Sequence, residues 1–250
     1  MLLASRLIRA SRVLGHSHSR ALASTAYASK SAFFHGDTRL NFSKAAHAPA
    51  ERRATPPTPA NAAAVPEHLS QHLDKTFAPL KFPPAVAQRI LTHLSHRESV
   101  IGHNSRFAFL GRRTLEAYLL LFLQALPAAA GHDHARIVAH VLNTHTLGQH
   151  VAPRWKLQEV MRWVPPRAGD IVLDGREAGV HKVAGTTVEA VVGGVLHQFG
   201  GSVAHRLFHT RVLPHILLPG SPLGLPDVLH ADALSAVERY GGPEGPLLRS

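Results

Sequence analysis

A chain of 250 residues allows one or two domains, and about 180 residues remain after a proline-rich N-terminal region, enough to bury one apolar core. The absence of cysteine excludes a disulfide framework and thiolate metal sites. The net charge of +11 is unevenly spread, because residues 1–66 hold nine Lys or Arg against two Asp or Glu, whereas residues 67–250 hold eighteen against fourteen. The part expected to fold is only mildly basic, so its charge permits a polyanionic partner such as RNA without requiring one.

The first 34 residues contain no acidic side chain and place Arg6, Arg9, Arg12 and Arg20 among serines, alanines and helically spaced leucines. An arginine-rich, acid-poor amphipathic start of this kind is typical of a mitochondrial transit peptide. We therefore predict a transit peptide over residues 1–34 and a mitochondrial location. A basic tail that binds RNA is the alternative.

Residues 35–66 are rich in alanine and proline and poor in large apolar side chains, which predicts a disordered linker or extended arm. Two short helical patterns follow, over residues 67–77 and 84–94, separated by Pro83 and Pro84.

A long helix is predicted from Asn104 to Leu126, where a proline-free apolar segment is closed by Pro127. Gly111 lies in its middle, which indicates close approach of a neighbouring helix. The apolar run Tyr118–Ala130 is shorter than the roughly 20 residues that a membrane-spanning helix requires, so we expect a core helix and no membrane insertion.

The remainder of the chain is also expected to be helical, with no convincing strand alternation. The fold class is therefore all-α, with one domain over residues 67–217 and a C-terminal tail over 218–250. Gly193 and Gly194 are interpreted as a device for tight helix crossing. The predicted segments are a helix over 132–146, a short amphipathic segment over 154–163, a loop over 169–179, helices over 182–199 and 202–213, and a weak helix over 227–240.

The stretch His103–Leu115, HNSRFAFLGRRTL, resembles the signature of the ribonuclease III family, which reads roughly HNERLEFLGDAVL. Leu91-Thr92-His93, followed by a serine at 95, is similar to the lead-in of that signature. Gly185–Val195 resembles the second acidic helix of the family, and Val141–Gly148 is similar to a third stretch between them. The resemblance covers about residues 65–217 in the expected order, and it implies a ribonuclease III-like helical domain.

In that family, carboxylates on two helices hold divalent metal ions that activate water. The resemblance places these carboxylate positions on Ser105, Ala108, Arg112, Thr186 and Glu189, of which only the last is acidic. Alanine offers no ligand to a hard cation and arginine repels it. We therefore predict a degenerate, non-catalytic domain without metal or cofactor, in which the remaining glutamate forms a cap or salt bridge inside the domain.

Several basic residues are candidates for RNA contact. Within the signature they form either a phosphate-binding patch or ordinary surface salt bridges, and Arg112 and Glu116 have the spacing of an ion pair. Around Trp155 and Trp163, basic and aromatic side chains alternate as in a surface that stacks on RNA bases, although a core role for the tryptophans is favoured. The candidates are Arg106, Arg112, Arg113, Arg154, Lys156, Arg162, Arg206 and Arg211.

Histidines are numerous, and five of them lie between residues 132 and 150. Their spacings do not align on one helix face, so we interpret them as scattered rather than as metal ligands.

The resemblance extends to fungal mitochondrial large-subunit ribosomal proteins, which combine a transit peptide with a lone degenerate domain of this family. It implies a structural component of the mitochondrial large ribosomal subunit. The expected partners are ribosomal RNA and other proteins of that subunit, among them a related ribonuclease III-like protein that pairs through the signature-helix region. Two alternatives remain open, namely an endoribonuclease that borrows carboxylates from a partner, and a mitochondrial RNA-processing or assembly factor.

Overall fold

The computed structural model describes residues 66–168, 171–172 and 179–248. The predicted transit peptide and nearly all of the predicted linker lie outside these residues, as does most of the loop predicted over 169–179.

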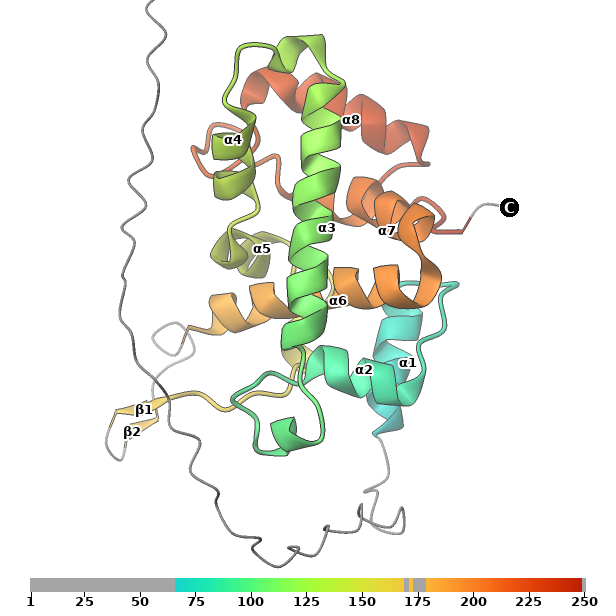
Figure 1. Ribbon diagram of the computed structural model, residues 1–250, viewed down its shortest axis with the longest axis vertical. Helices are drawn as coiled ribbons and strands as arrows, with labels where there is room; N and C mark the ends of the chain where they lie inside the picture. The colour runs from blue at the N-terminus through green and yellow to red at the C-terminus, as the bar shows by residue number, and fades with distance from the viewer. Residues whose placement is uncertain (1–65, 169–170, 173–178, 249–250) are drawn as a thin grey trace, which may run out of the picture. The chain divides into compact units, whose positions relative to one another are not determined.

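Helices are the main regular structure of the described residues, as predicted, and one small antiparallel hairpin is also present (Figure 1). The α-helices are α1 Glu67–Thr76, α2 Pro84–Leu91, α3 Ser105–Gln124, α4 His134–Val141, α5 Thr144–His150, α6 Val180–Phe199, α7 Gly201–Leu207 and α8 His230–Arg239. The hairpin pairs β1 Arg167–Ala168 with β2 Ile171–Val172. Short 3-10 turns cover Arg97–Val100, Pro127–Ala129, Leu157–Glu159, Leu213–His215 and Asp227–Leu229, and a π-helical turn covers Phe208–Val212.

Helices α3 and α6 form the centre of the fold, and α6 passes across the upright α3 in Figure 1. Helix α3 forms where the proline-free apolar run predicts it, and Phe107, Leu115, Leu119 and Leu123 are buried along one side. Helix α6 is apolar around most of its circumference and is buried between neighbours on several sides, as expected for a helix without a polar face.

Two glycines allow the backbones of α3 and α6 to touch. A Cβ atom on Gly111 would overlap the carbonyl of Glu189 and lie 2.7 Å from the backbone nitrogen of Gly193. A Cβ atom on Gly193 would in turn overlap the carbonyl of Phe107 and lie 2.8 Å from the nitrogen of Gly111. The interpretation of both glycines as sites of close helix approach is therefore confirmed. Gly148 on α5 and Gly185 on α6 make a second contact of the same kind.

The prediction of one helix over residues 132–146 is wrong, because two helices, α4 and α5, occupy this region. Helix α4 begins after Asp133, whose side chain accepts a hydrogen bond from the backbone nitrogen of Arg136 at 3.1 Å. Helix α5 begins after Asn143, whose side chain accepts one from the nitrogen of His145 at 2.9 Å. Asparagine stabilises the start of a helix better than its interior, so it ends one helix and caps the next.

The amphipathic segment predicted over 154–163 is mostly turns, with one 3-10 turn at Leu157–Glu159 and a left-handed residue at Lys156. Trp155 is 2% exposed, and Trp163 packs against the core. The core role favoured for both tryptophans is thus confirmed.

The C-terminal part of the chain differs from the prediction in two respects. His209 and Arg211, which fall in the helix predicted over 202–213, are buried, and the chain after α7 continues as a π-helical turn. The core also extends beyond residue 217, since Leu229 and Leu247 are fully buried within it. The weak helix predicted over 227–240 is present as a 3-10 turn followed by α8.

The apolar run Tyr118–Ala130 contributes Leu119, Leu123 and Ala129 to the core, as predicted. None of the helices in the described ranges has both the length and the apolar character needed to span a bilayer.

The α3–α6 crossing predicts a large effect for a small substitution. Gly111→Ala should destabilise the domain by about 2–4 kcal/mol, because the added methyl group meets backbone atoms that cannot move aside independently. The measurement is urea-induced unfolding. Gly201→Ala is the matched control, since its Cβ would lie 3.6 Å from the Tyr118 hydroxyl oxygen, an ordinary contact. Equal stability of the two variants would contradict the tight crossing.

Candidate functional site

Glu189 lies where α6 crosses α3 and is 4% exposed. The Thr144 hydroxyl at the start of α5 donates a hydrogen bond to Glu189 Oε1 at 2.9 Å. Arg112 on α3 places its Nη1 atom 3.7 Å from the same oxygen. The carboxylate therefore makes a salt bridge inside the domain, as predicted.

Arg112 also binds the neighbouring polar groups. Its Nη1 atom donates to the Thr144 hydroxyl at 3.3 Å, and its Nε atom lies 3.5 Å from Glu116 Oε1. The ion pair predicted between Arg112 and Glu116 is confirmed. Arg113 contacts the second oxygen of Glu116 at 2.7 Å, so α3 carries a small network of two arginines and one glutamate beside Glu189.

Burial is the largest influence on Glu189, and it raises the pKa of the carboxyl group above its usual value. The hydrogen bond from Thr144 and the positive charge of Arg112 act in the opposite direction, while Glu116 adds to the rise. Arg112 thus supplies a permanent positive charge to a carboxylate that has little contact with water.

The other positions that the resemblance assigns to metal ligands offer nothing for a cation. Ala108 is buried, Ser105 Oγ lies 3.0 Å from His103 Nδ1, and the Thr186 hydroxyl donates to the Lys182 carbonyl at 3.0 Å. Within the described part of the chain, no group of three or more His, Cys, Asp or Glu side chains is arranged to hold a metal ion. The five positions that the resemblance assigns therefore present one carboxylate, Glu189, which is paired with an arginine, and the neighbouring Glu116 is paired with Arg112 and Arg113.

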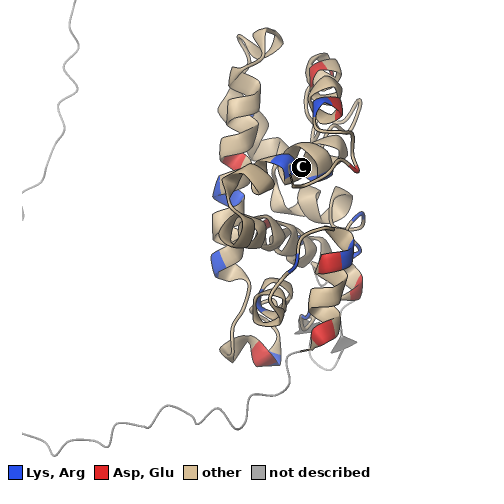
Figure 2. Cartoon of the chain, turned by 90° about the vertical axis from the view of Figure 1, so that its right-hand side faces the viewer, with Lys and Arg blue, Asp and Glu red and all other residues tan. Residues whose placement is uncertain are grey.

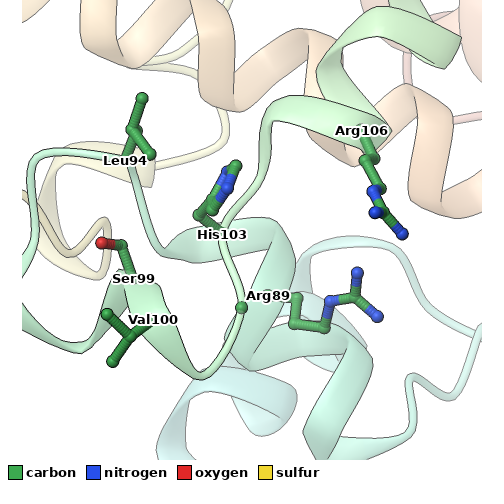
Figure 3. Close-up of a pocket in the computed structure, with 7 residues that line it drawn as sticks. Arg89, Leu94, Ser99, Val100, His103 and Arg106 are labelled. Carbon is green, nitrogen blue, oxygen red and sulfur yellow. The ribbon is translucent and has the colours of Figure 1, made fainter. Parts of the chain in front are cut away.

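A second polar site opens beside the beginning of α3 (Figure 3). It is a pocket of about 440 Å³ in which Arg89, His103 and Arg106 face the apolar side chains of Leu94 and Val100. Figure 3 shows the guanidinium groups of Arg89 and Arg106 on the same side of the His103 ring. No acidic residue is among the described residues that line the pocket, so its electrostatics favour an anion.

Local backbone geometry holds this pocket in shape. Gly102 has φ +155°, and a Cβ atom there would press to 2.9 Å from Arg89 Cγ, so the glycine makes room for the arginine stem. The Arg89 guanidinium lies 5.6 Å from the centroid of the Phe107 ring, a cation–π contact that orients it from α2 toward α3.

Four of the eight predicted RNA-contacting residues are exposed, namely Arg106, Arg113, Arg154 and Lys156. The other four are half-buried or buried, namely Arg112, Arg162, Arg206 and Arg211. Figure 2 shows basic and acidic positions interspersed along the described helices rather than gathered on one face in that view. In that view the basic positions do not follow one another without interruption.

Two of these RNA candidates, Arg162 and Arg211, form ion pairs within the domain. Arg162 Nη2 lies 2.5 Å from Glu98 Oε2 and ties the 3-10 turn before α3 to the segment before the hairpin. Arg211 is buried, donates to the Pro243 carbonyl and pairs with Glu244 at 3.2 Å. Both guanidinium groups are used to hold segments of the domain together.

Sequence reasoning missed Arg89 and Thr144. Thr144 lies in the stretch similar to the third family segment, so its position carried a signal, but its hydroxyl contact with Glu189 depends on how α5 packs on α6. Nothing in the sequence around Arg89 indicates a functional role, because only the packing of α2 beside the start of α3 brings its side chain to His103 and Arg106.

Removing the Arg112 charge should destabilise the domain in a pH-dependent way. Arg112→Met leaves Glu189 buried beside Thr144 without a cation, and we expect a loss of about 1–2 kcal/mol, reduced because the arginine side chain is 43% exposed. The loss should be larger at about pH 8 than at about pH 5, because the raised pKa of Glu189 allows the carboxyl group to become neutral as the pH falls. The measurement is urea unfolding at both pH values.

The double variant Arg112→Met with Glu189→Gln is the matched control, since the amide keeps an acceptor for Thr144 and needs no countercharge. It should recover most of the lost stability at the higher pH. A loss for Arg112→Met that is equal at both pH values would show that its packing, and not its charge, stabilises the site.

Two comparisons with known proteins, one with a family model and one with solved structures, find ribonuclease III-like domains. The family model described as ribonuclease-III-like matches residues 83–216, more than half of the chain. No curated protein matches. Among solved structures, a nuclease domain of ribonuclease III from Campylobacter jejuni is similar at 18% identity, covering 54% of this chain and 87% of that one with a TM-score of 0.44. A second structure of that nuclease domain, described for flexibility in its dimer-forming region, is similar at 17% identity, covering 58% and 96% with a TM-score of 0.47. The family-model match alone carries the assignment: the chain belongs to the ribonuclease-III-like family.

Proposed function

We propose that this chain is a non-catalytic structural protein of the mitochondrial large ribosomal subunit, where its ribonuclease III-like domain binds ribosomal RNA and a related protein. The observation that carries the proposal is the pairing of Glu189 with Arg112. The single buried carboxylate at the helix crossing has a protein cation as its partner, where hydrolysis of a phosphodiester would need metal ions.

The loss of catalysis follows from charge and geometry. A magnesium ion needs oxygen ligands, and the positions on α3 that face Glu189 hold a buried alanine and an arginine. The guanidinium group repels a divalent ion and has a fixed charge at every physiological pH. An ordered water activated by metal therefore has no place beside Glu189.

Binding of RNA is supported by the pocket at the start of α3. Arg89 and Arg106 project from two helices into one opening, where each can contact a phosphate oxygen, and the His103 ring lies to one side of both guanidinium groups. Contacts of this kind read the RNA backbone and not its sequence. Backbone contacts of this kind are sufficient for a structural protein that binds one fixed segment of RNA.

Pairing with a related protein is supported by exposed apolar side chains near the same end of α3. Val100 is 90% exposed, Ile101 lies beside it, and Phe109 on the signature helix is 66% exposed. Large apolar side chains that gather at a surface are typical of a protein interface. The mitochondrial location rests on the arginine-rich, acid-free sequence of residues 1–34.

Sedimentation of mitochondrial ribosomes on sucrose gradients tests the assignment. The chain should sediment with the large subunit and remain there at high salt, whereas an assembly factor would be released.

Arg89→Gln with Arg106→Gln should lower the salt concentration at which the chain dissociates from the subunit, because two phosphate contacts and their released counterions are lost. The double variant Lys75→Gln with Arg136→Gln removes the same charge from exposed positions on α1 and α4 and should behave as the wild type. Absence from the large-subunit fractions at low salt would overturn the proposal.

A nuclease assay separates a structural protein from an enzyme. The purified chain, incubated with magnesium and double-stranded RNA, should leave the RNA intact. Cleavage that is abolished by Glu189→Gln would show that the remaining carboxylate is catalytic and would refute the non-catalytic assignment. Cleavage that persists in Glu189→Gln would come from a contaminating nuclease and would leave the expected result in place after further purification.

A further inference from the structure

A pocket of about 430 Å³ lies at the opposite end of α3 from the Arg89 and Arg106 site. Its walls come from the last turns of α3, from the α7 region and from the end of α8. The helical rise between Arg106 and Leu121 puts roughly 22 Å between the two sites, so one ligand group cannot occupy both. The volume is in the range of pockets that bind small organic ligands.

One wall of the pocket contains a buried histidine with an unused polar atom. His209 is 6% exposed, and its Nδ1 atom has no hydrogen-bond partner among the described residues. Its Nε2 atom lies 3.2 Å from His205 Nε2, and its ring stacks on Tyr240 with centroids 4.8 Å apart. A buried polar atom without a partner costs free energy, which a ligand with a matching polar edge would recover.

The backbone that carries His209 is itself unusual. Phe208–Val212 is a π-helical turn, a rare conformation that occurs often at functional sites. Burial, together with the neighbouring His205 and Arg239, lowers the pKa of His209 to about 4. The ring is therefore neutral near pH 7, and it can exchange one hydrogen bond with a ligand without bringing a charge into the pocket.

The opening of the pocket combines two cations with an apolar surface. Arg206 lies 5.4 Å from the centroid of the Tyr240 ring and donates from Nε to the Pro246 carbonyl, which fixes the direction of its guanidinium group. Arg239 is exposed and forms no salt bridge within the described residues. Leu121, 63% exposed, and Phe122, 7% exposed, provide the apolar side. None of the described lining residues is acidic.

We propose that this pocket binds a nucleotide, either free or as an unpaired residue of an RNA strand. The phosphate lies at Arg206 and Arg239, the base lies against Leu121 and Phe122, and a polar edge of the base meets His209. A fatty acid or other apolar anion would satisfy the arginines but would leave the buried imidazole nitrogen without a partner. The site is independent of the ribosomal assignment, because it is defined by the isolated chain.

Binding of adenosine monophosphate and of short single-stranded oligoribonucleotides to the full chain, measured by calorimetry, tests the proposal. Arg239→Gln should weaken adenosine monophosphate binding by about tenfold or more, as expected for the loss of a charged hydrogen bond. Arg136→Gln removes the same charge from an exposed position on α4 and should leave the affinity unchanged. The His209 imidazole signals in nitrogen NMR spectra should shift when the nucleotide binds.

The remaining arms distinguish the sources of the ligand. Binding of the mononucleotide alone identifies a free nucleotide as the occupant, and binding of the oligonucleotide alone, lost in Arg239→Gln, identifies RNA. Inorganic phosphate should bind much more weakly than either. His209→Phe keeps the aromatic stack and should abolish the preference of the site for adenosine monophosphate over phosphate. Equal binding of phosphate and nucleotide to the wild type, or no binding of any probe, would overturn the proposal.

Discussion

The backbone contact between α3 and α6 at Gly111 and Gly193 is the constraint on which the rest of the domain depends. A side chain at either position would separate the helices, and both the core and the polar site lie along their line of contact. Arg112 follows Gly111 directly, and Glu189 lies one helical turn before Gly193. The crossing that closes the core therefore also brings the arginine to the glutamate.

The Arg112–Glu189 pair differs from a metal site in the source of the positive charge that balances the buried carboxylate. A buried carboxylate without a partner would destabilise the fold, and a metal ion would compensate for it only while bound. A guanidinium group from α3 is always present, and Thr144 satisfies another lone pair of the same oxygen. The Glu189 carboxylate thus has a protein cation as its countercharge and does not depend on a bound ion for one.

The two ends of α3 present different chemistry to the surroundings. Near its beginning, Arg89 and Arg106 share an anion-binding opening with exposed apolar side chains nearby. Near its end, the pocket around His209 and Arg239 adds a neutral imidazole to two arginines. Elsewhere along the described helices, acidic and basic positions are interspersed in the view of Figure 2.

Much of the fold was predictable from local patterns. The apolar run after Phe107 predicted α3, Gly111 and Gly193 predicted a close crossing, and the signature residues implied the family and the loss of its acids. These features depend on residues near one another along the chain or on the steric demand of a single glycine, and both are present in the sequence itself.

Other features were decided only by tertiary structure. The break at Asn143 depended on an asparagine side chain that caps the start of α5 instead of lying in a helix interior. The ion pairs of Arg162 and Arg211 depended on partners distant in the sequence, Glu98 and Glu244. Whether a basic side chain faces solvent or pairs inside the domain is not encoded in its type or its spacing. It is determined by which segments pack against it, and that packing is formed by the whole chain at once.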